Sequence, residues 1–176
     1  LGSVKGALYQ DIPDVKIVDI SNNISPFNII EAAYIIENSY KNFPVGTIHI
    51  IGVDSEFNVE KKHLVIYLDE HYFICADNGI LSLLCNKIMP EKIVEINIFD
   101  NKNTTFPVLD VFVKVAAHIH RGGTIDLVGT KTEKIIDVHE INPILNNKKK
   151  EIIGHVIYID NYGNVVLNIT QNIFKK

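Results

Sequence analysis

Arginine is almost absent from this chain, because Arg121 is the only one among 176 residues. A single guanidinium excludes the arginine clusters that clamp phosphate groups bidentately. The formal net charge is -4, and the densest basic run, Lys148-Lys149-Lys150, is typical of a solvated loop. We therefore expect no general nucleic-acid binding, which requires a basic surface that neutralises many phosphates.

Cysteine and long apolar runs are scarce as well. Cys75 and Cys85 are the only cysteines, and they stand too far apart for a CxxC zinc or redox motif. Two cysteines without a secretory signal favour free thiols in a reducing, cytoplasmic setting. No apolar run is long enough to span a bilayer, so we expect no membrane partner.

Several motifs of common enzyme classes are also missing. The sequence has no GxGxxG or GxxxxGK[ST] motif for nucleotide phosphates and no GxSxG motif for a nucleophilic serine. His118 and His120 lie two residues apart on a predicted helix, so they point to nearly opposite faces. The remaining histidines show no ligand spacing, and we expect no metal site.

The residues that are present indicate an α/β fold. Hydrophobic residues make up 47% of the chain and charged residues 22%, as in globular proteins. Helical and extended patterns alternate to about Ile125, which predicts an α/β layered domain with helices on both faces of a sheet. The expected helices are 2–10, one beginning at Ser25-Pro26, 79–85 and 108–120, and the expected strands are 15–20, 47–53, 63–68, 71–74 and 93–99.

The helical pattern stops after Asp126, and strands are expected at 134–138, 154–159 and 165–169. We interpret this as the start of an all-β, barrel-like C-terminal domain. The predicted organisation is an N-terminal domain at 1–141, a linker at 142–150 and a partial second domain at 151–176. The chain opens without Met and stops just after these strands, so we expect segments to be missing at both ends.

Two polar turns and one acidic residue are the first candidates for a ligand site. The turns are Ala76-Asp77-Asn78-Gly79 and the segment from Asp160 to Asn164, each at the end of a predicted strand. Asp54 ends the apolar strand 47–53, where ligand sites of open α/β sheets lie. Asp54 is thus a candidate general base or anchor, although an Asp that caps the following turn explains the pattern equally well.

Read together, several segments resemble one family. They are Ile17-Val18-Asp19-Ile20-Ser21, Pro26-Phe27, Phe43-Pro44-Val45-Gly46-Thr47, Val53-Asp54, Ala76-Asp77-Asn78-Gly79, Thr105-Phe106 and Tyr158-Ile159-Asp160-Asn161-Tyr162-Gly163-Asn164. In this order they resemble the S-adenosyl-L-methionine (SAM) hydroxide adenosyltransferases, which include adenosine-forming SAM hydrolases and are related to the SAM-dependent fluorinase and chlorinase. The resemblance implies a homotrimer that binds SAM between the N-terminal domain of one subunit and the C-terminal domain of the next. It implies SAM as substrate and no cofactor.

The resemblance also assigns roles to individual residues. Asp54 matches the Asp that positions or deprotonates water, with Lys61 at the catalytic Arg position seven residues later. The residues implied to contact or border the substrate are Phe27 and Phe106 at the ribose and sulfonium, Asp160 at the amino-acid moiety, Asn164 at adenine, and Asp77 and Asn78 in the turn beside the site.

Three departures from the family pattern bear on activity. Lys61 replaces the Arg, Pro107 replaces the His, and Ser55-Glu56-Phe57-Asn58 replaces Pro-Gly-Val-Gly. The expected function is attack of water on C5′ of SAM to give adenosine and L-methionine, and the alternative is a catalytically weak or inactive SAM or adenosine-binding protein. A third interpretation is an unrelated α/β protein that shares only the architecture. Halogenation is disfavoured, because Val108 stands where halogenases are expected to have a polar residue.

Overall fold

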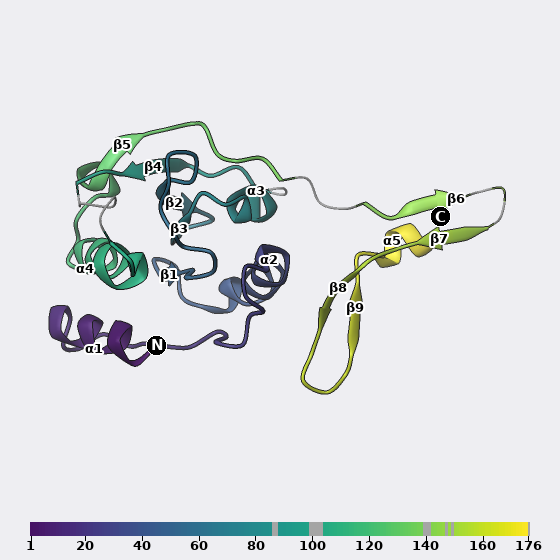
Figure 1. Cartoon of the computed structure of the whole chain (residues 1–176), viewed down its shortest axis with the longest axis horizontal. Coiled ribbons are helices and arrows are strands. Elements are labelled where there is room, and N and C mark those ends of the chain that lie inside the picture. Colours follow the sequence, from purple (N-terminus) through teal and green to yellow (C-terminus); the bar gives the residue numbers. More distant parts are fainter. Residues whose placement is uncertain (86–87, 99–103, 139–141, 147, 149, 176) are drawn as a thin grey trace. The chain divides into compact units, whose positions relative to one another are not determined.

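A computed structural model covers the chain and describes residues 1–85, 88–98, 104–138, 142–146, 148 and 150–175. The chain divides into two compact units, Leu1–Asp137 and Val138–Lys176 (Figure 1). The domain bounds of the whole protein remain a prediction.

The first unit contains a mixed five-stranded sheet with strand order β1-β3-β2-β4-β5. Strands β1 (Ile48–Ile50) and β3 (His71–Ala76) run parallel, and the other neighbouring strands are antiparallel. The remaining strands are β2 (His63–Leu68), β4 (Lys92–Ile96) and β5 (Gly129–Lys131). Strand β2 is buried along almost its whole length, as expected for a strand that is covered on both faces.

The β2–β3 hairpin turns at Asp69-Glu70, which confirms the sequence prediction. Both residues have positive φ, 51° and 62°, as a type I′ turn requires. Glycine and asparagine usually fill these positions, so the turn needs support from elsewhere. Tyr40, in the short helix η1 (Tyr40–Asn42), donates its hydroxyl to Asp69 Oδ2 at 3.0 Å.

Helices lie on both faces of the sheet, which confirms the predicted α/β class (Figure 1). Helices α1 (Gly2–Asp11) and α4 (Val113–His120) share one core with the sheet, in which Leu8 and Phe112 pack with Val65 and Ile74. Helices α2 (Ile29–Glu37) and α3 (Ile80–Cys85) lie on the other side. The predicted helix 108–120 begins as a π-helical turn, η2 (Val108–Phe112), and a short helix η3 (Ile125–Val128) precedes β5.

Two predicted strands are wrong. Residues 15–20 form no strand and pair with none of the described strands, and the apolar side chains of Val15 and Ile17 instead pack against the core. Residues 134–138 also lie outside any ladder. There the backbone N–H of Ile136 donates to the carboxylate of Asp77 rather than to a neighbouring strand.

The predicted helix start at Ser25-Pro26 is also wrong, because Phe27 adopts φ 62° and interrupts the helical path. Asn28 is the N-cap, and its side chain accepts from the backbone N–H of Glu31 at 3.1 Å. Glu31 in turn accepts from the N–H of Ser25 at 3.0 Å. The Asn28 bond is one half of a capping box, whereas the Glu31 carboxylate binds the N–H of Ser25 rather than that of the N-cap residue.

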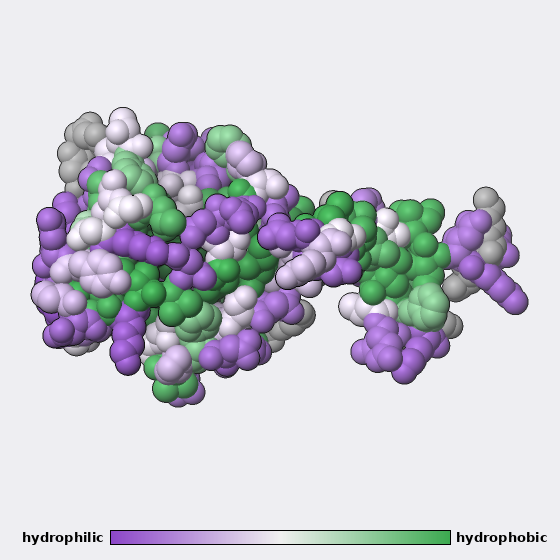
Figure 2. Space-filling model, turned by 90° about the horizontal axis from the view of Figure 1, so that it is seen from below, coloured by the Kyte–Doolittle hydropathy of each residue, from purple (hydrophilic) through white to green (hydrophobic). Residues whose placement is uncertain are grey.

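The second unit consists of two hairpins and a short helix. Strand β6 (Ile144–Asn146) pairs with β7 (Glu151–Ile153), β8 (Val156–Ile159) pairs with β9 (Val165–Leu167), and α5 spans Gln171–Phe174. Strand β6 falls within the segment predicted as a linker. None of the described residues of this unit is buried, and hydrophobic side chains lie at its surface (Figure 2).

Candidate functional site

Asp54 lies in a strained turn just beyond β1. Its φ of 48° is left-handed, a conformation that Asp tolerates better than most residues. The side-chain amide of Asn78 donates to the carbonyl oxygens of Val53 at 2.9 Å and Asp54 at 3.2 Å. The amide oxygen of Asn78 accepts from the N–H of Ile80 at 3.1 Å. The side chain of Asn78 therefore fixes the turn that carries Asp54.

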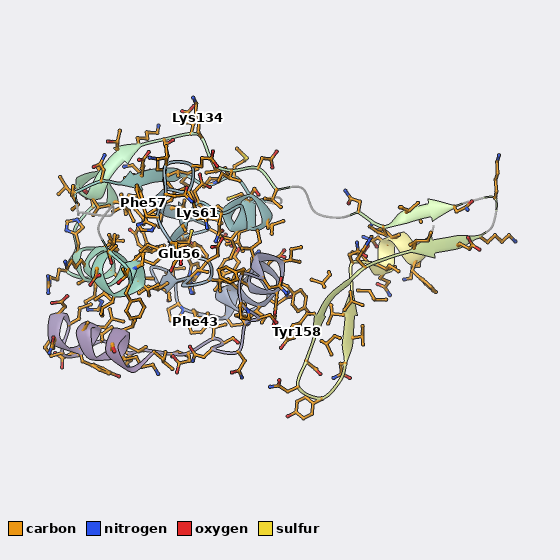
Figure 3. All side chains as sticks on the ribbon, in the orientation of Figure 1. Phe43, Glu56, Phe57, Lys61, Lys134 and Tyr158 are labelled. Atoms are coloured by element: carbon orange, nitrogen blue, oxygen red, sulfur yellow. The ribbon has the colours of Figure 1, made fainter. Side chains whose placement is uncertain are left out.

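Asp54 forms an ion pair with Lys61, whose Nζ lies 2.6 Å from Oδ1. Both side chains are about one-fifth exposed, at 20% and 19%, so the pair is partly shielded from water. The loop between them is closed by Asn58, which accepts from the N–H of Glu60 at 2.9 Å and of Lys61 at 2.6 Å. The structure thus brings together the two predicted catalytic residues, in the region where Figure 3 labels Glu56, Phe57 and Lys61.

The start of η2 packs against the chain just before Asp54. A Cβ added to Gly52 would lie 3.1 Å from Cγ2 of Val108, so the two segments approach closely at this glycine. Pro107 is buried and is the N-cap residue of η2. Phe106, which is 39% exposed, precedes it. The segment that contains Phe106 therefore lies beside the Asp54 turn.

Asp77 is bound to neighbouring backbone at the end of β3. Its N–H donates to the carbonyl of Lys62 at 2.7 Å, and its Oδ1 accepts from the N–H of Ile136 at 2.9 Å. Burial raises the pKa of the Asp77 carboxyl. A shallow cleft of about 300 Å³ lies here, lined by Lys62, Asp77, Glu95 and Lys134 among others. Asp77 thus ties segment 132–137 to the sheet next to this cleft.

Phe27 is 71% exposed on the surface before α2, and no described contact joins it to Asp54.

Asp160 and Asn164 belong to the second unit and contact each other. Oδ1 of Asp160 accepts from the N–H groups of Tyr162 and Asn164, and Oδ2 accepts from the Asn164 side chain at 2.7 Å. These hydrogen bonds lower the pKa of the Asp160 carboxyl, and the bond from the Asn164 side chain has the largest effect. The turn between β8 and β9 is therefore ordered by its own side chains.

His63, the first residue of β2, was not singled out by the sequence. Its Nε2 lies 2.9 Å from the carbonyl oxygen of Ser55, the residue after Asp54. The side chain is fully buried between the rings of Phe57 and Phe112. Burial of a histidine is set by tertiary packing, so the residue pattern carried no signal for this contact.

A larger depression of about 480 Å³ lies between α1 and α4, lined by Asp11, Lys114, Ala117, His118, Arg121 and Gly123. It contains none of the predicted site residues, whereas the Asp54 turn gathers several, so we place the candidate site at that turn.

Among the described residues, no group of three or more His, Cys, Asp or Glu side chains could hold a metal ion. In the same part of the chain, no helix has the length and apolarity to cross a bilayer.

Comparison with solved structures agrees with this fold. The crystal structure of an uncharacterized conserved protein from Thermotoga maritima matches with a TM-score of 0.85 and 28% identity, covering 98% of this chain and 67% of that one. A conserved hypothetical protein from Thermus thermophilus matches with a TM-score of 0.69 and 19% identity, covering 96% of this chain and 66% of that one.

Sequence comparison gives relatives with named activities. A protein of Methanocaldococcus jannaschii named (R)-S-adenosyl-L-methionine hydrolase is 29% identical over 98% of this chain. A protein of the same name from Salinispora arenicola is 22% identical over 94% of this chain. The chain spans 62% and 65% of the lengths of these two relatives.

Residues 1–129 match the family described as the SAM hydroxide adenosyltransferase N-terminal domain. This match takes in β1 to β4, the Asp54 turn, Lys61 and η2. The chain therefore belongs to the SAM hydroxide adenosyltransferase family.

Proposed function

We propose that this protein hydrolyses SAM to adenosine and L-methionine. The observation that carries the proposal is the Asp54–Lys61 ion pair, 2.6 Å long and partly shielded, at the end of β1 in a chain of this family. Two relatives bear the name (R)-S-adenosyl-L-methionine hydrolase, which supports SAM as the substrate and the (R) configuration at sulfur as the preferred form.

The reaction needs a base and alignment but no acid. The oxygen of water forms a bond to C5′ of the ribose, the C5′–S bond breaks, and its electron pair stays on sulfur. The sulfonium thereby becomes the neutral thioether of methionine, and the water proton is lost to a base and then to solvent. Alignment of water, C5′ and sulfur can supply much of the rate, and a carboxylate base adds about 10²–10⁴-fold.

Asp54 is the proposed base. Its second oxygen, Oδ2, is the one that would take the water proton, since Lys61 contacts Oδ1. Lys61 supplies one cationic contact but cannot reproduce the planar fork of an arginine. Pro107 has no side-chain donor or acceptor, so this chain would depend on Asp54 more than a relative with histidine at that position would.

The remaining residues have proposed roles in binding. Phe106, beside the Asp54 turn, would contact the ribose and sulfonium, and Phe27 would join it. Asp160 and Asn164 would bind the amino-acid and adenine parts from the second unit, in a homotrimer whose site lies between subunits. Asp77 and Asn78 would act by holding the backbone around the site, in keeping with their hydrogen bonds to Ile136, Val53 and Asp54.

A second candidate function is binding of SAM or adenosine without turnover. The buried Pro107 at the start of η2 favours it, because no side chain at that position can assist a water molecule. Under this alternative the turns would still recognise the nucleoside, and Asp54 would serve as a ligand anchor.

The two functions are separated by incubating the full-length protein with each sulfonium epimer of SAM and measuring adenosine by chromatography and binding by calorimetry. We expect adenosine from the (R) form and a loss of about 100-fold in rate with Asp54→Asn. Asp19→Asn is the matched control, because Asp19 forms an ion pair with Lys5 at 2.5 Å outside the site. Binding without adenosine would support the second function, and no binding would contradict both.

A further inference from the structure

His63 is a fully buried polar side chain in contact with the loop that carries Asp54. Its relative exposure is 0%, and it stands at the start of β2, opposite Ala76 of β3. Phe57 contacts the imidazole from the loop at a ring distance of 5.3 Å, and Phe112 contacts it from η2 at 4.9 Å. The ring is thus held between the loop itself and η2.

The hydrogen bond of His63 fixes which nitrogen carries the proton. A backbone carbonyl can only accept, so Nε2 must donate to the oxygen of Ser55. The other nitrogen, Nδ1, is buried and has no hydrogen-bond partner among the described residues. Burial lowers the pKa of His63, which keeps the imidazole neutral with Nδ1 unprotonated.

This arrangement is poor for stability alone. A buried polar atom without a partner destabilises the folded state, and an aliphatic side chain of similar size would avoid that cost. The gain is a fixed position for the carbonyl of Ser55, which is bonded directly to the segment that must hold Asp54 at positive φ. Asn78 binds the carbonyls of Val53 and Asp54, and His63 binds the next one.

Three consecutive carbonyl oxygens are therefore held by two side chains from neighbouring strand ends. The peptide planes of residues 53–55 cannot rotate without breaking one of these bonds, and the direction of the Asp54 side chain depends on them. We propose that His63 is a positioning residue that aims the carboxylate of Asp54 at the reacting water. This inference rests on the proposed hydrolase function.

The test compares three substitutions in the full-length protein. His63→Gln places an amide nitrogen the same number of bonds from the backbone as Nε2 and can still donate to Ser55. His63→Asn is polar but too short, and His63→Leu fills space without a donor. His49→Gln is the matched control, because His49 is another buried histidine, hydrogen-bonded to His71 and not to the loop.

We expect His63→Asn and His63→Leu to lower kcat by about 10–100-fold while the Kd for SAM changes little, because misplacement of about 1 Å can cost 10²-fold in rate. His63→Gln should restore kcat to within about threefold of the original. The same kcat for the Leu and Gln variants would overturn the proposal, as would a change in Kd without a change in kcat.

Hydrogen exchange of the amides in residues 55–62 provides a readout that needs no activity. Exchange there should speed up in the Asn and Leu variants and return to the original rate in the Gln variant. If the unaltered protein makes no adenosine, the proposed function fails, and the exchange rates still decide whether His63 holds the loop. Unchanged exchange in His63→Leu would refute the positioning role by itself.

Discussion

The buried histidine pair beside the β2–β3 turn should make the protein sensitive to mild acid. His49 Nε2 lies 3.2 Å from His71 Nδ1, and both residues are buried, at 5% and 4% exposure. Tyr40 and Phe73 contact both rings. Burial lowers the pKa of both histidines, so the folded state favours a neutral pair.

The size of the acid effect follows from the pKa of His49, which is lowered from 6.5 to about 4. Burial is the largest cause of this shift, and the charge of His71 is the second. Above pH 6.5 both the folded and the unfolded chain are neutral at this residue. As the pH falls from 6.5 to about 4, the unfolded chain takes up a proton that the folded chain refuses, so the free energy of unfolding decreases. Over about 2.5 pH units, at about 1.36 kcal/mol per unit, the full loss is about 3–4 kcal/mol.

The assay compares the original protein with His49→Gln, whose amide nitrogen keeps the hydrogen bond to His71 but does not titrate. Urea unfolding is followed by circular dichroism, since the chain has no tryptophan. Carboxylates titrate in both proteins, so the difference in unfolding free energy between them reports on His49. That difference should grow from pH 6.5 down to 4 and then level off. Parallel curves over this range would refute the reasoning.

Three further predictions concern the site. Asn78→Ala should lower the free energy of unfolding by about 1–3 kcal/mol in urea titrations, because the partly buried carbonyls of Val53 and Asp54 lose their donor; no change would mean that the Asp54 turn is held by other contacts. Lys61→Met should lower kcat for adenosine release by about tenfold, and Lys61→Arg should restore it, because the cation that contacts Oδ1 holds the Asp54 carboxylate in place; equal rates for both variants would contradict that role. Asp160→Ala should raise the Kd for SAM in calorimetry by about tenfold or more, since a carboxylate bond to a charged group contributes about 1.5–3 kcal/mol, while the melting of the first unit stays unchanged; an unchanged Kd would remove Asp160 from the binding site.

Patterns of neighbouring residues in the sequence predicted much of the secondary structure of the first unit. The Asp69-Glu70 hairpin and the α3 and α4 helices follow from turn residues and from hydrophobic spacing, which depend on neighbours in the chain. The cap of α2 was missed, because the prediction rested on Ser25-Pro26 alone, whereas Asn28 caps the helix through the N–H of Glu31.

Other features depended on distant partners. The alternation over residues 15–20 predicts an extended backbone, yet a strand also needs a neighbour with free hydrogen-bonding groups, and Val15 and Ile17 only pack against the core. Asp54 and Lys61 could be paired by the family resemblance, and the loop closed by Asn58 explains their contact. The hydrogen bonds that Asn78 and His63 make to the backbone of residues 53–55 depend on tertiary packing, which no local pattern encodes.

The turn at Asp69 shows how a sequence can retain a residue that its backbone disfavours. Glycine at this left-handed position would relieve about 1 kcal/mol of steric strain. It would also remove the acceptor of the Tyr40 hydroxyl, and with it the tether between the hairpin tip and η1. Replacement by glycine would thus change the free energy of unfolding in two opposite directions. The residue at this tip is therefore selected in part by the Tyr40 hydroxyl, 29 positions earlier in the chain.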